Sequence, residues 1–308
     1  MRVAVASGKG GTGKTTVAVS LALSLVDDPG RGNEGTNRPQ PLLLDCDVEA
    51  PDAHLFLHRE VEESVPASVP VPRIDQDRCT LCGACVDVCA YHALALLGGE
   101  VRLFPELCHG CGSCRLACPE QVITEVPREV GLLEVGHGAG VRFAQGILHV
   151  GEAMPLPVIR QLKKWVRAAP DQVTILDAPP GTSCPMVETV RGSDFVILVT
   201  EPTPFGLHDL ALAVEVLREL GLPAGVIVNR DSGAFGELEA FCQAEGLPIL
   251  LRIPFERAIA ETIARGGTLL DVHPDFAVRL RGMMTFIGET VADVPAMAPG
   301  PRKESGHS

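Results

Sequence analysis

Short runs of apolar residues recur along the chain and predict the strands of a sheet. Most of these runs lack the alternation of apolar and polar residues that marks a half-buried strand, so we expect strands covered on both faces. The predicted strands occupy residues 2–6, 42–45, 173–177, 195–200, 224–229 and 249–253.

Between these runs, apolar residues recur with the spacing of an amphipathic helix. The predicted helices occupy residues 14–26, 156–168, 207–220, 235–245 and 255–264. Alternating strands and helices are typical of an α/β fold, in which helices flank a mostly parallel sheet and the connections are right-handed. The pattern therefore predicts an α/β main domain.

The alternation is lost once, over residues 73–128, where cysteines dominate. The proline-rich stretches SVPASVPVP and TEVPRE flank this segment, and we interpret them as linkers. We therefore predict a main domain in two parts, residues 1–72 and 129–294, with a small domain inserted at residues 73–128. Residues 27–41 are predicted to form a polar loop, and residues 295–308 a disordered tail.

Charge and cysteine content narrow the class of protein. The chain has 308 residues with 26 Lys and Arg against 39 Asp and Glu, a formal net charge of -13, which argues against nucleic acid as a partner. The sequence has neither a signal-peptide pattern nor an apolar run long enough to span a membrane, so we expect a cytoplasmic protein without stable membrane insertion. In that compartment the 11 cysteines favour metal ligation over disulfides.

A glycine-rich segment, GKGGTGKT, follows the first predicted strand and precedes the first predicted helix. It matches the phosphate-binding loop, in which backbone N–H groups and a helix N-terminus surround phosphate oxygens. In this interpretation Lys14 reaches the β- and γ-phosphates and the Thr15 hydroxyl helps to hold Mg²⁺. The predicted nucleotide-binding residues of the loop are Gly8, Gly10, Gly11, Thr12, Gly13, Lys14, Thr15 and Thr16.

Two alternatives apply to this loop. Gly8, Gly10 and Gly13 also satisfy the dinucleotide-binding pattern, but that site needs an acidic residue about 20 positions further on. The nearest acid at a predicted strand end, Asp45, comes 32 residues after Gly13, and the dinucleotide site has no use for Lys14. An unoccupied glycine-rich turn is the other alternative.

The second lysine of the loop gives KGGTGKT, which resembles the deviant Walker A loop of the MinD, Mrp and nitrogenase iron protein superfamily. The resemblance implies a P-loop ATPase that binds ATP or ADP with Mg²⁺ and forms a homodimer with nucleotide at the interface. It also implies that Lys9 crosses this interface to the nucleotide of the partner subunit. A solvated surface lysine is the alternative role for Lys9.

Further motifs agree with this superfamily. LLLDCDVEAPD resembles its first switch, in which Asp47 orients the attacking water, and VTILDAPPGTS resembles its second acidic motif. There, Asp177 would support Mg²⁺ through water and the Gly181 N–H would sense the γ-phosphate. The resemblance also implies that Asn229 pairs with adenine and that Pro254 belongs to a loop closing over the base. The alternatives are helix N-caps for the two aspartates and a turn residue for Asn229.

The cysteine-rich segment contains the spacing C-x₂-C-x₂-C-x₃-C twice, separated by 18 residues. This duplicated run is the pattern of bacterial two-cluster ferredoxins, in which the fourth cysteine of each run ligates the other cluster. The predicted ligands of cluster one are Cys79, Cys82, Cys85 and Cys118, and those of cluster two are Cys108, Cys111, Cys114 and Cys89. Zinc is the alternative metal, although zinc sites usually combine two C-x₂-C pairs. The insert is thus predicted to be a ferredoxin-like α+β domain with two [4Fe–4S] clusters.

Three cysteines lie outside these runs. Cys184 follows Asp177 by seven residues, an offset that resembles the cluster-ligating cysteine of the nitrogenase iron protein. No other cysteine lies between Cys118 and Cys184, so we interpret Cys184 as a small buried side chain and leave a shared site across a dimer open. Tyr91 is expected near a cluster. His109 is expected to be an ordinary surface residue, and tuning of a cluster's reduction potential is the alternative role.

As a whole, the chain resembles MinD-superfamily ATPases that contain an inserted ferredoxin domain. This resemblance implies an ATP-hydrolysing, redox-linked homodimer that couples nucleotide state to electron transfer through two [4Fe–4S] clusters. Two alternatives are an Mrp-like ATPase that assembles or carries an iron–sulfur or metal cofactor, and a MinD-like positioning ATPase with structural clusters. Because each oxidised cluster with four thiolates adds negative charge, we expect a redox or client protein with a basic patch.

Overall fold

The computed structural model describes residues 1–26, 39–233 and 235–293. The chain divides into two compact units. Unit one contains Met1–Leu43 and Ala168–Ser308, and unit two contains Leu44–Arg167. Most of the predicted 27–41 loop and the predicted tail at 295–308 lie outside the described residues.

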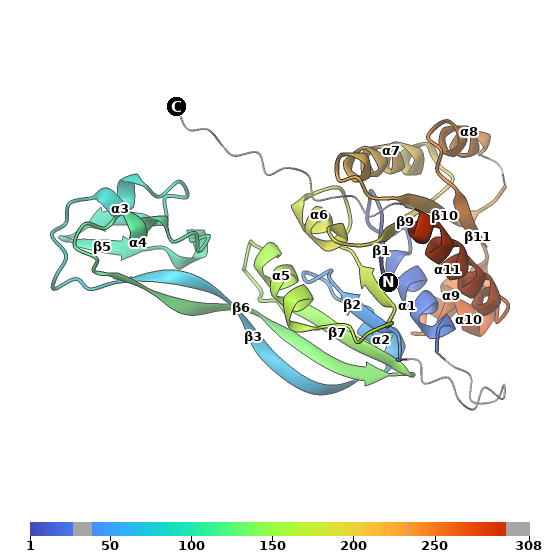
Figure 1. Cartoon of the computed structure of the whole chain (residues 1–308), viewed down its shortest axis with the longest axis horizontal. Coiled ribbons are helices and arrows are strands. Elements are labelled where there is room, and N and C mark those ends of the chain that lie inside the picture. The colour runs from blue at the N-terminus through green and yellow to red at the C-terminus, as the bar shows by residue number, and fades with distance from the viewer. Residues whose placement is uncertain (27–38, 234, 294–308) are drawn as a thin grey trace. The chain divides into compact units, whose positions relative to one another are not determined.

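Unit one is built around parallel strands (Figure 1). Their order is β11-β10-β9-β1-β8, and every neighbouring pair is parallel. The central strands are buried along most of their length, as expected where helices cover both faces. The bounds are Arg2–Ala6 for β1, Thr174–Asp177 for β8, Phe195–Thr200 for β9, Ala224–Asp231 for β10 and Ile249–Pro254 for β11.

The helices of unit one follow the strands in alternation, which confirms the predicted mostly parallel α/β fold. Of these helices, α6, α10 and the last one, α11, were not predicted. Helix α11 contacts α1, and Arg281 Nη1 donates a hydrogen bond to Ser24 O over 2.9 Å. The bounds are Lys14–Ser24 for α1, Cys184–Val190 for α6, Pro204–Glu219 for α7, Gly236–Ala244 for α8, Arg257–Ala264 for α9, Leu269–Val272 for α10 and Phe276–Asp293 for α11.

Strand β2, Leu42–Asp45, begins in unit one and ends in unit two. All four of its residues are buried, and the Leu42 N–H donates to Val173 O over 2.9 Å. The strand was predicted with these same bounds, because three consecutive leucines followed by Asp45 form one of the short apolar runs of the sequence.

Unit two is dominated by a long antiparallel ribbon of β3 and β6. β3 spans Glu60–Ile74 and β6 spans Ile123–Gly138. β7, at Val141–Leu148, pairs antiparallel with the second half of β6, from Gly131 to Gly138. Helix α5, Leu156–Trp165, packs against these three strands, and the short helix α2 spans His54–Leu57. The ribbon leads into the cysteine-rich segment (Figure 1).

The interpretation of the proline-rich stretches as linkers was wrong, because both stretches are strands of this ribbon. β3 is an edge strand of the sheet, where a residue without an N–H is tolerated. Its prolines Pro66, Pro70 and Pro72 share the outer edge with Ser68, whose N–H donates to Gln161 Oε1 of α5 over 3.1 Å. Pro127 of β6 lies beyond the part of that strand that pairs with β7.

The cysteine-rich segment forms a small α+β arrangement with a core of its own. Its core consists of Cys85, Leu94, Val101, Val122 and Ile123. Helices α3 and α4 contact each other, and strands β4 and β5 form an antiparallel hairpin. The bounds are Ala84–Asp87 for α3, Leu94–Leu97 for β4, Glu100–Leu103 for β5, Pro105–Leu107 for the 3₁₀ turn η2 and Ser113–Ala117 for α4.

The predicted domain boundaries at 72/73 and 128/129 remain a prediction. The two compact units divide instead at Leu43 and Arg167, so that the ribbon and the cysteine-rich segment belong to one unit. Among the described residues, no helix combines the length and the apolar character that crossing a membrane requires.

Candidate functional site

The glycine-rich loop connects β1 to α1 in unit one. Gly11 and Gly13 have φ angles of 77° and 90°, which glycine adopts without strain. Gly13 directly precedes Lys14, the first residue of α1, and no side chain caps this helix end. The N-terminus of α1 therefore has uncapped N–H groups and a positive dipole end, which suit an anion.

Two glycines of the loop leave no space for a side chain. A Cβ at Gly8 would lie 2.1 Å from the backbone oxygen of Asp209 in α7, and one at Gly13 would lie 2.4 Å from Asn229 Nδ2. Asn229 in turn donates to Thr12 O over 2.7 Å. The strand end at β10 and the start of α7 thus pack directly on the loop and fix its path.

A substitution pair tests this packing. Gly13→Ala should destabilise the fold by about 2–3 kcal/mol, since it combines the cost of a left-handed alanine with loss of the Asn229 hydrogen bond. Gly11→Ala is the matched control, because its φ is also positive but its Cβ would meet nothing within 4 Å. Urea unfolding of both variants checks this, and equal destabilisation would contradict the close packing at Gly13.

The side chains of the loop suit a phosphate. Lys14 is only 6% exposed, and the buried hydroxyl of Thr12 has no hydrogen-bond partner among the described residues. Thr15 and Thr16 are half-buried at the start of α1. A buried ammonium, an unpaired hydroxyl and an open helix N-terminus together fit a nucleotide phosphate with Mg²⁺, which Thr15 would help to hold.

Lys9 forms an ion pair within its own subunit. Its Nζ lies 3.2 Å from Glu201 Oε2, just after β9, and Arg230 at the end of β10 pairs with the same carboxylate. The Ser7 hydroxyl donates to Lys9 O over 2.6 Å, which further fixes the loop. Sequence reasoning did not find Glu201, because nothing in its local sequence pattern connects it to a residue 192 positions earlier.

The predicted nucleotide-sensing residues of unit one gather beside the loop. Asp177 is fully buried at the end of β8. Four residues later, Gly181 has a φ of 88° and its N–H donates to Ser7 O over 3.1 Å. To sense a γ-phosphate, this N–H must leave the Ser7 carbonyl.

The predicted base-binding residues, Asn229 and Pro254, lie in β10 and β11. Besides its bond to Thr12, Asn229 accepts a hydrogen bond from the Arg230 N–H over 2.9 Å, so both ends of the amide are engaged with protein. Pro254 ends β11 beside Asp231, and the following Phe255 is 71% exposed. Asn229 therefore supports the phosphate loop, and an adenine contact by its side chain would require it to reorient.

The first-switch aspartate belongs to unit two. Asp47 is half-buried, and its N–H donates to Asp45 Oδ1 over 3.1 Å. The other oxygen of Asp45 accepts from the N–H groups of Asp52 and Ala53, both over 3.1 Å. Asp45 thus organises the turn that carries Asp47, the residue predicted to orient water.

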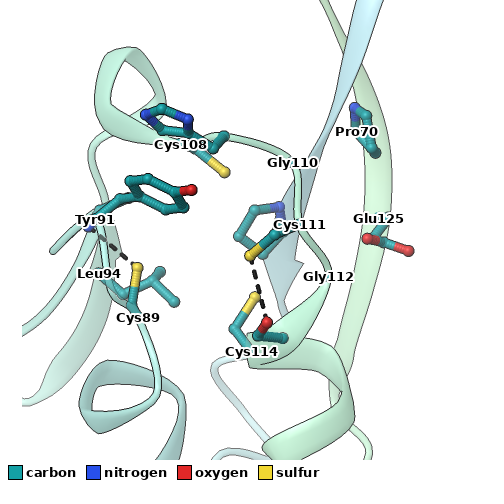
Figure 2. A pocket seen from close by; sticks show the side chains of 14 residues that line it. Pro70, Cys89, Tyr91, Leu94, Cys108, Gly110, Cys111, Gly112, Cys114 and Glu125 are labelled. Atoms are coloured by element: carbon teal, nitrogen blue, oxygen red, sulfur yellow. Dashed lines mark hydrogen bonds between the residues drawn. The ribbon is translucent and has the colours of Figure 1, made fainter. Parts of the chain in front are cut away.

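The eight cysteines of the two runs line two separate cavities in unit two. Cys79, Cys82, Cys85 and Cys118 line one, which we call cavity one. Cys89, Cys108, Cys111 and Cys114 line the other, cavity two, and Figure 2 shows their sulfur atoms facing a common space. These are the two sets that the spacing predicts, with one cysteine exchanged between the runs; the ligand assignment itself remains a prediction.

The origin of the cysteines in each cavity favours a cluster over a single zinc ion. Each cavity is lined by three cysteines of one run and the fourth cysteine of the other run. Zinc sites usually combine two C-x₂-C pairs, whereas this exchange of the fourth cysteine is the pattern of two-cluster ferredoxins.

The backbone repeats its conformation in the two runs. Gly83 and Gly112 precede α3 and α4 with φ angles of 82° and 74°. Two positions before each of them, Leu81 and Gly110 have φ angles of 57° and 65°. A leucine in the left-handed region costs about 1–2 kcal/mol, so the surroundings impose this geometry on a residue that does not favour it.

The thiols differ in their acidity. Burial raises the pKa of the Cys85 and Cys114 thiols. A hydrogen bond with the Ser113 side chain lowers the pKa of Cys111. Because a metal requires thiolates, loading of these cavities depends on pH and releases protons.

Two aromatic rings stack at cavity two. The rings of Tyr91 and His109 lie 3.5 Å apart between centroids, with an angle of 8° between their planes, and both residues line the cavity. Tyr91 is therefore adjacent to a predicted cluster site, as expected. His109, expected to be an ordinary surface residue, is the stacking partner that sequence reasoning missed.

The remaining cysteines lie elsewhere. Cys46 and Cys242 are buried, and burial raises the pKa of the Cys242 thiol to about 11, which keeps it protonated. The interpretation of Cys184 as a buried side chain was wrong, because it is exposed as the first residue of α6. Within α6, the first buried residue is Met186, the third residue of the helix.

A phosphate-binding loop between the first strand and the first helix of a parallel α/β fold defines a P-loop nucleotide-binding protein. The chain belongs to the CobQ/CobB/MinD/ParA nucleotide binding domain family, which matches residues 3–269. The solved structure of the septum site-determining protein MinD with Mg-ADP from Pyrococcus horikoshii has a similar fold, with a TM-score of 0.55. It is 18% identical and covers 95% of this chain and 99% of that chain.

Three proteins illustrate the similarity in sequence. An uncharacterized protein of Methanocaldococcus jannaschii is 31% identical over 75% of this chain and 78% of its own length. An iron-sulfur cluster carrier protein of Deinococcus radiodurans is 25% identical over 96% of this chain and 73% of its own length. A ferredoxin of Pyrobaculum islandicum is 47% identical over 53 residues, which are 17% of this chain and 50% of that protein.

Proposed function

We propose that this protein is a homodimeric ATPase that couples its nucleotide state to electron transfer through two [4Fe–4S] clusters to a partner protein. The observation that carries the proposal is the presence of both sites in one chain. An uncapped helix N-terminus beside Lys14 suits ATP, and two cavities with four cysteines each suit the clusters. The ferredoxin relative supports the second site, and the family supports the first.

In this proposal, the residues of the phosphate-binding loop bind ATP and two aspartates take part in its hydrolysis. Lys14 and the amides of the loop would hold the β- and γ-phosphates, and Thr15 would hold Mg²⁺. Asp47 would orient the attacking water, and Asp177 would support the metal through water. The clusters supply one-electron chemistry when bound, and their cysteine ligands hold them in place.

The nucleotide dependence of electron transfer tests this function. The reconstituted protein is reduced with dithionite and mixed with a basic c-type cytochrome, whose haem accepts one electron per reduced cluster. We expect the rate to differ between ATP, ADP and no nucleotide. A rate that is the same in all three conditions contradicts the coupling.

A second candidate function is that of an iron–sulfur cluster carrier. The observation that favours it is the similarity along 96% of the chain to a protein named as a carrier. In each cysteine set one member, Cys82 or Cys111, is exposed, which gives an incoming client access. ATP-dependent transfer of iron and sulfide to an apo-ferredoxin, with loss from this protein, would favour the carrier function over electron transfer.

The ion pair of Lys9 bears on the homodimer. If Lys9 crosses to the partner's nucleotide, it must leave Glu201, so the pair favours the monomer. Glu201→Gln should therefore tighten ATP-dependent dimerisation by about 5–30-fold, since one pair breaks in each subunit and a partly exposed pair contributes about 0.5–1 kcal/mol. Lys9→Ala should bind ATP but not dimerise, as measured by analytical ultracentrifugation.

Two further variants test whether Glu201 affects dimerisation through Lys9. The double variant Lys9→Ala with Glu201→Gln should behave like Lys9→Ala, because Glu201 acts through Lys9. Glu239→Gln is the charge control, since Glu239 pairs with Arg252 instead. Weaker dimerisation of Glu201→Gln would show that Glu201 positions Lys9 for the interface rather than restraining it.

A further inference from the structure

The cysteines of the two cavities are similar in their exposure to solvent. Each set contains one buried, one exposed and two half-buried members. The exposed members, Cys82 and Cys111, hold the same position in their runs. Solvent exposure, one of the factors that set the reduction potential of an iron–sulfur cluster, is therefore similar for both sets.

The hydrogen bonds to sulfur are not matched. The Ala93 N–H donates to Cys89 Sγ over 3.3 Å, and Ser113 Oγ lies 3.4 Å from Cys111 Sγ (Figure 2). Both cysteines line cavity two. Within the described part of the chain, no side chain makes a corresponding hydrogen bond to Cys79, Cys82, Cys85 or Cys118. The residue of the first run that corresponds to Ser113 is Ala84, which has no hydroxyl.

The charges near the cavities also favour reduction of a cluster in cavity two over reduction of one in cavity one. Glu125 lines cavity two, but Arg115 Nε lies 3.2 Å from its Oε2 and offsets its charge. Glu120 lines cavity one and has no ion-pair partner within the described residues. An uncompensated carboxylate disfavours the addition of an electron to a nearby cluster.

When Cys111 is a metal ligand it carries no proton, so the Ser113 hydroxyl is the donor of that pair. The sulfur atoms are more negative in the reduced cluster than in the oxidised one. A donated hydrogen bond therefore stabilises the reduced form more and raises the potential.

We propose that the two clusters differ in reduction potential, with the cluster of cavity two the higher, and that Ser113 is the positioning residue that sets this difference. This inference rests on the proposed function only because it requires that both cavities hold a cluster. One electron delivered to the oxidised cluster one reduces it. The electron then passes to the oxidised cluster two, so that cluster one is re-oxidised and cluster two is reduced, and no bond breaks or forms. The electron available to a partner then resides on cluster two.

Variants at two corresponding positions test this proposal. Ser113→Ala should lower the higher midpoint and Ala84→Ser should raise the lower one, so that each narrows the gap. Each shift should amount to about a tenfold change in the one-electron equilibrium, or 59 mV. Ser113→Thr keeps the hydroxyl and should retain the original midpoints. The readout is a redox titration of the full chain followed by electron paramagnetic resonance.

The outcomes separate this inference from the proposed function. Unchanged midpoints in Ser113→Ala, or a shift of the lower midpoint alone, would overturn the inference while iron and sulfide contents show that both clusters are present. A chain that binds zinc or only one cluster after reconstitution would overturn the proposed function and this inference with it. Neither measurement involves nucleotide, so defects in ATP binding do not affect the result.

Discussion

Replacing Lys14 with alanine is expected to abolish nucleotide binding. The ammonium group is almost completely buried beside an uncapped helix N-terminus, where solvent screens its charge little. Hydrogen bonds to charged groups contribute about 1.5–3 kcal/mol each, so loss of the bonds to two phosphates should weaken binding by at least about 100-fold. Isothermal titration calorimetry with Mg-ATP measures the change.

The controls for Lys14→Ala are within the same loop. Lys9→Ala should keep the affinity for ATP, since its partner in the isolated subunit is Glu201. Alanine at position 14 is compatible with the first turn of α1, so the variant should fold with unchanged circular dichroism. If Lys14→Ala binds Mg-ATP within about threefold of the parent chain, the loop is not the nucleotide site.

The second large effect concerns Cys118. We expect Cys118→Ser to remove the cluster of cavity one, although Cys118 belongs to the second run of cysteines. The iron content should fall from about eight to about four atoms per chain, because the remaining three thiolates hold a four-iron cluster poorly. Cys242→Ser is the control, since Cys242 is buried in α8 and should leave the iron content unchanged.

Double variants decide whether ligation crosses between the runs. If it does, Cys118→Ser combined with Cys79→Ser removes the same cluster and leaves about four irons, whereas Cys118→Ser combined with Cys108→Ser removes both. If each run holds its own cluster, these two results are exchanged. Iron and acid-labile sulfide analysis of the purified chains distinguishes the two cases.

The local patterns of the sequence predicted a large part of this fold. The strands of unit one were predicted to within a few residues, because strands buried on both faces require continuous apolar runs. The loop at Gly8–Thr15 was recognised because the chemistry of phosphate binding fixes the spacing of Gly13, Lys14 and Thr15.

The β3–β6 ribbon was missed for a physical reason. Prolines usually interrupt strands, and the prolines of β3 are compatible with the sheet only because that strand is at its edge. Whether a strand lies at an edge depends on the pairing of residues as far apart as Glu60 and His137, which no local pattern contains.

By itself, the sequence determined the spacings: the phosphate loop, the two cysteine runs and the alternation of strands and helices. These features depend on residues a few positions apart, and so local chemistry fixes them. Only the tertiary structure decided that Glu201 holds Lys9 and that Asn229 supports Thr12. It also decided that the Ser113 hydroxyl lies beside Cys111 Sγ at cavity two. These contacts depend on how the chain folds back on itself, since hydrogen bonds and ion pairs act only over a few ångströms.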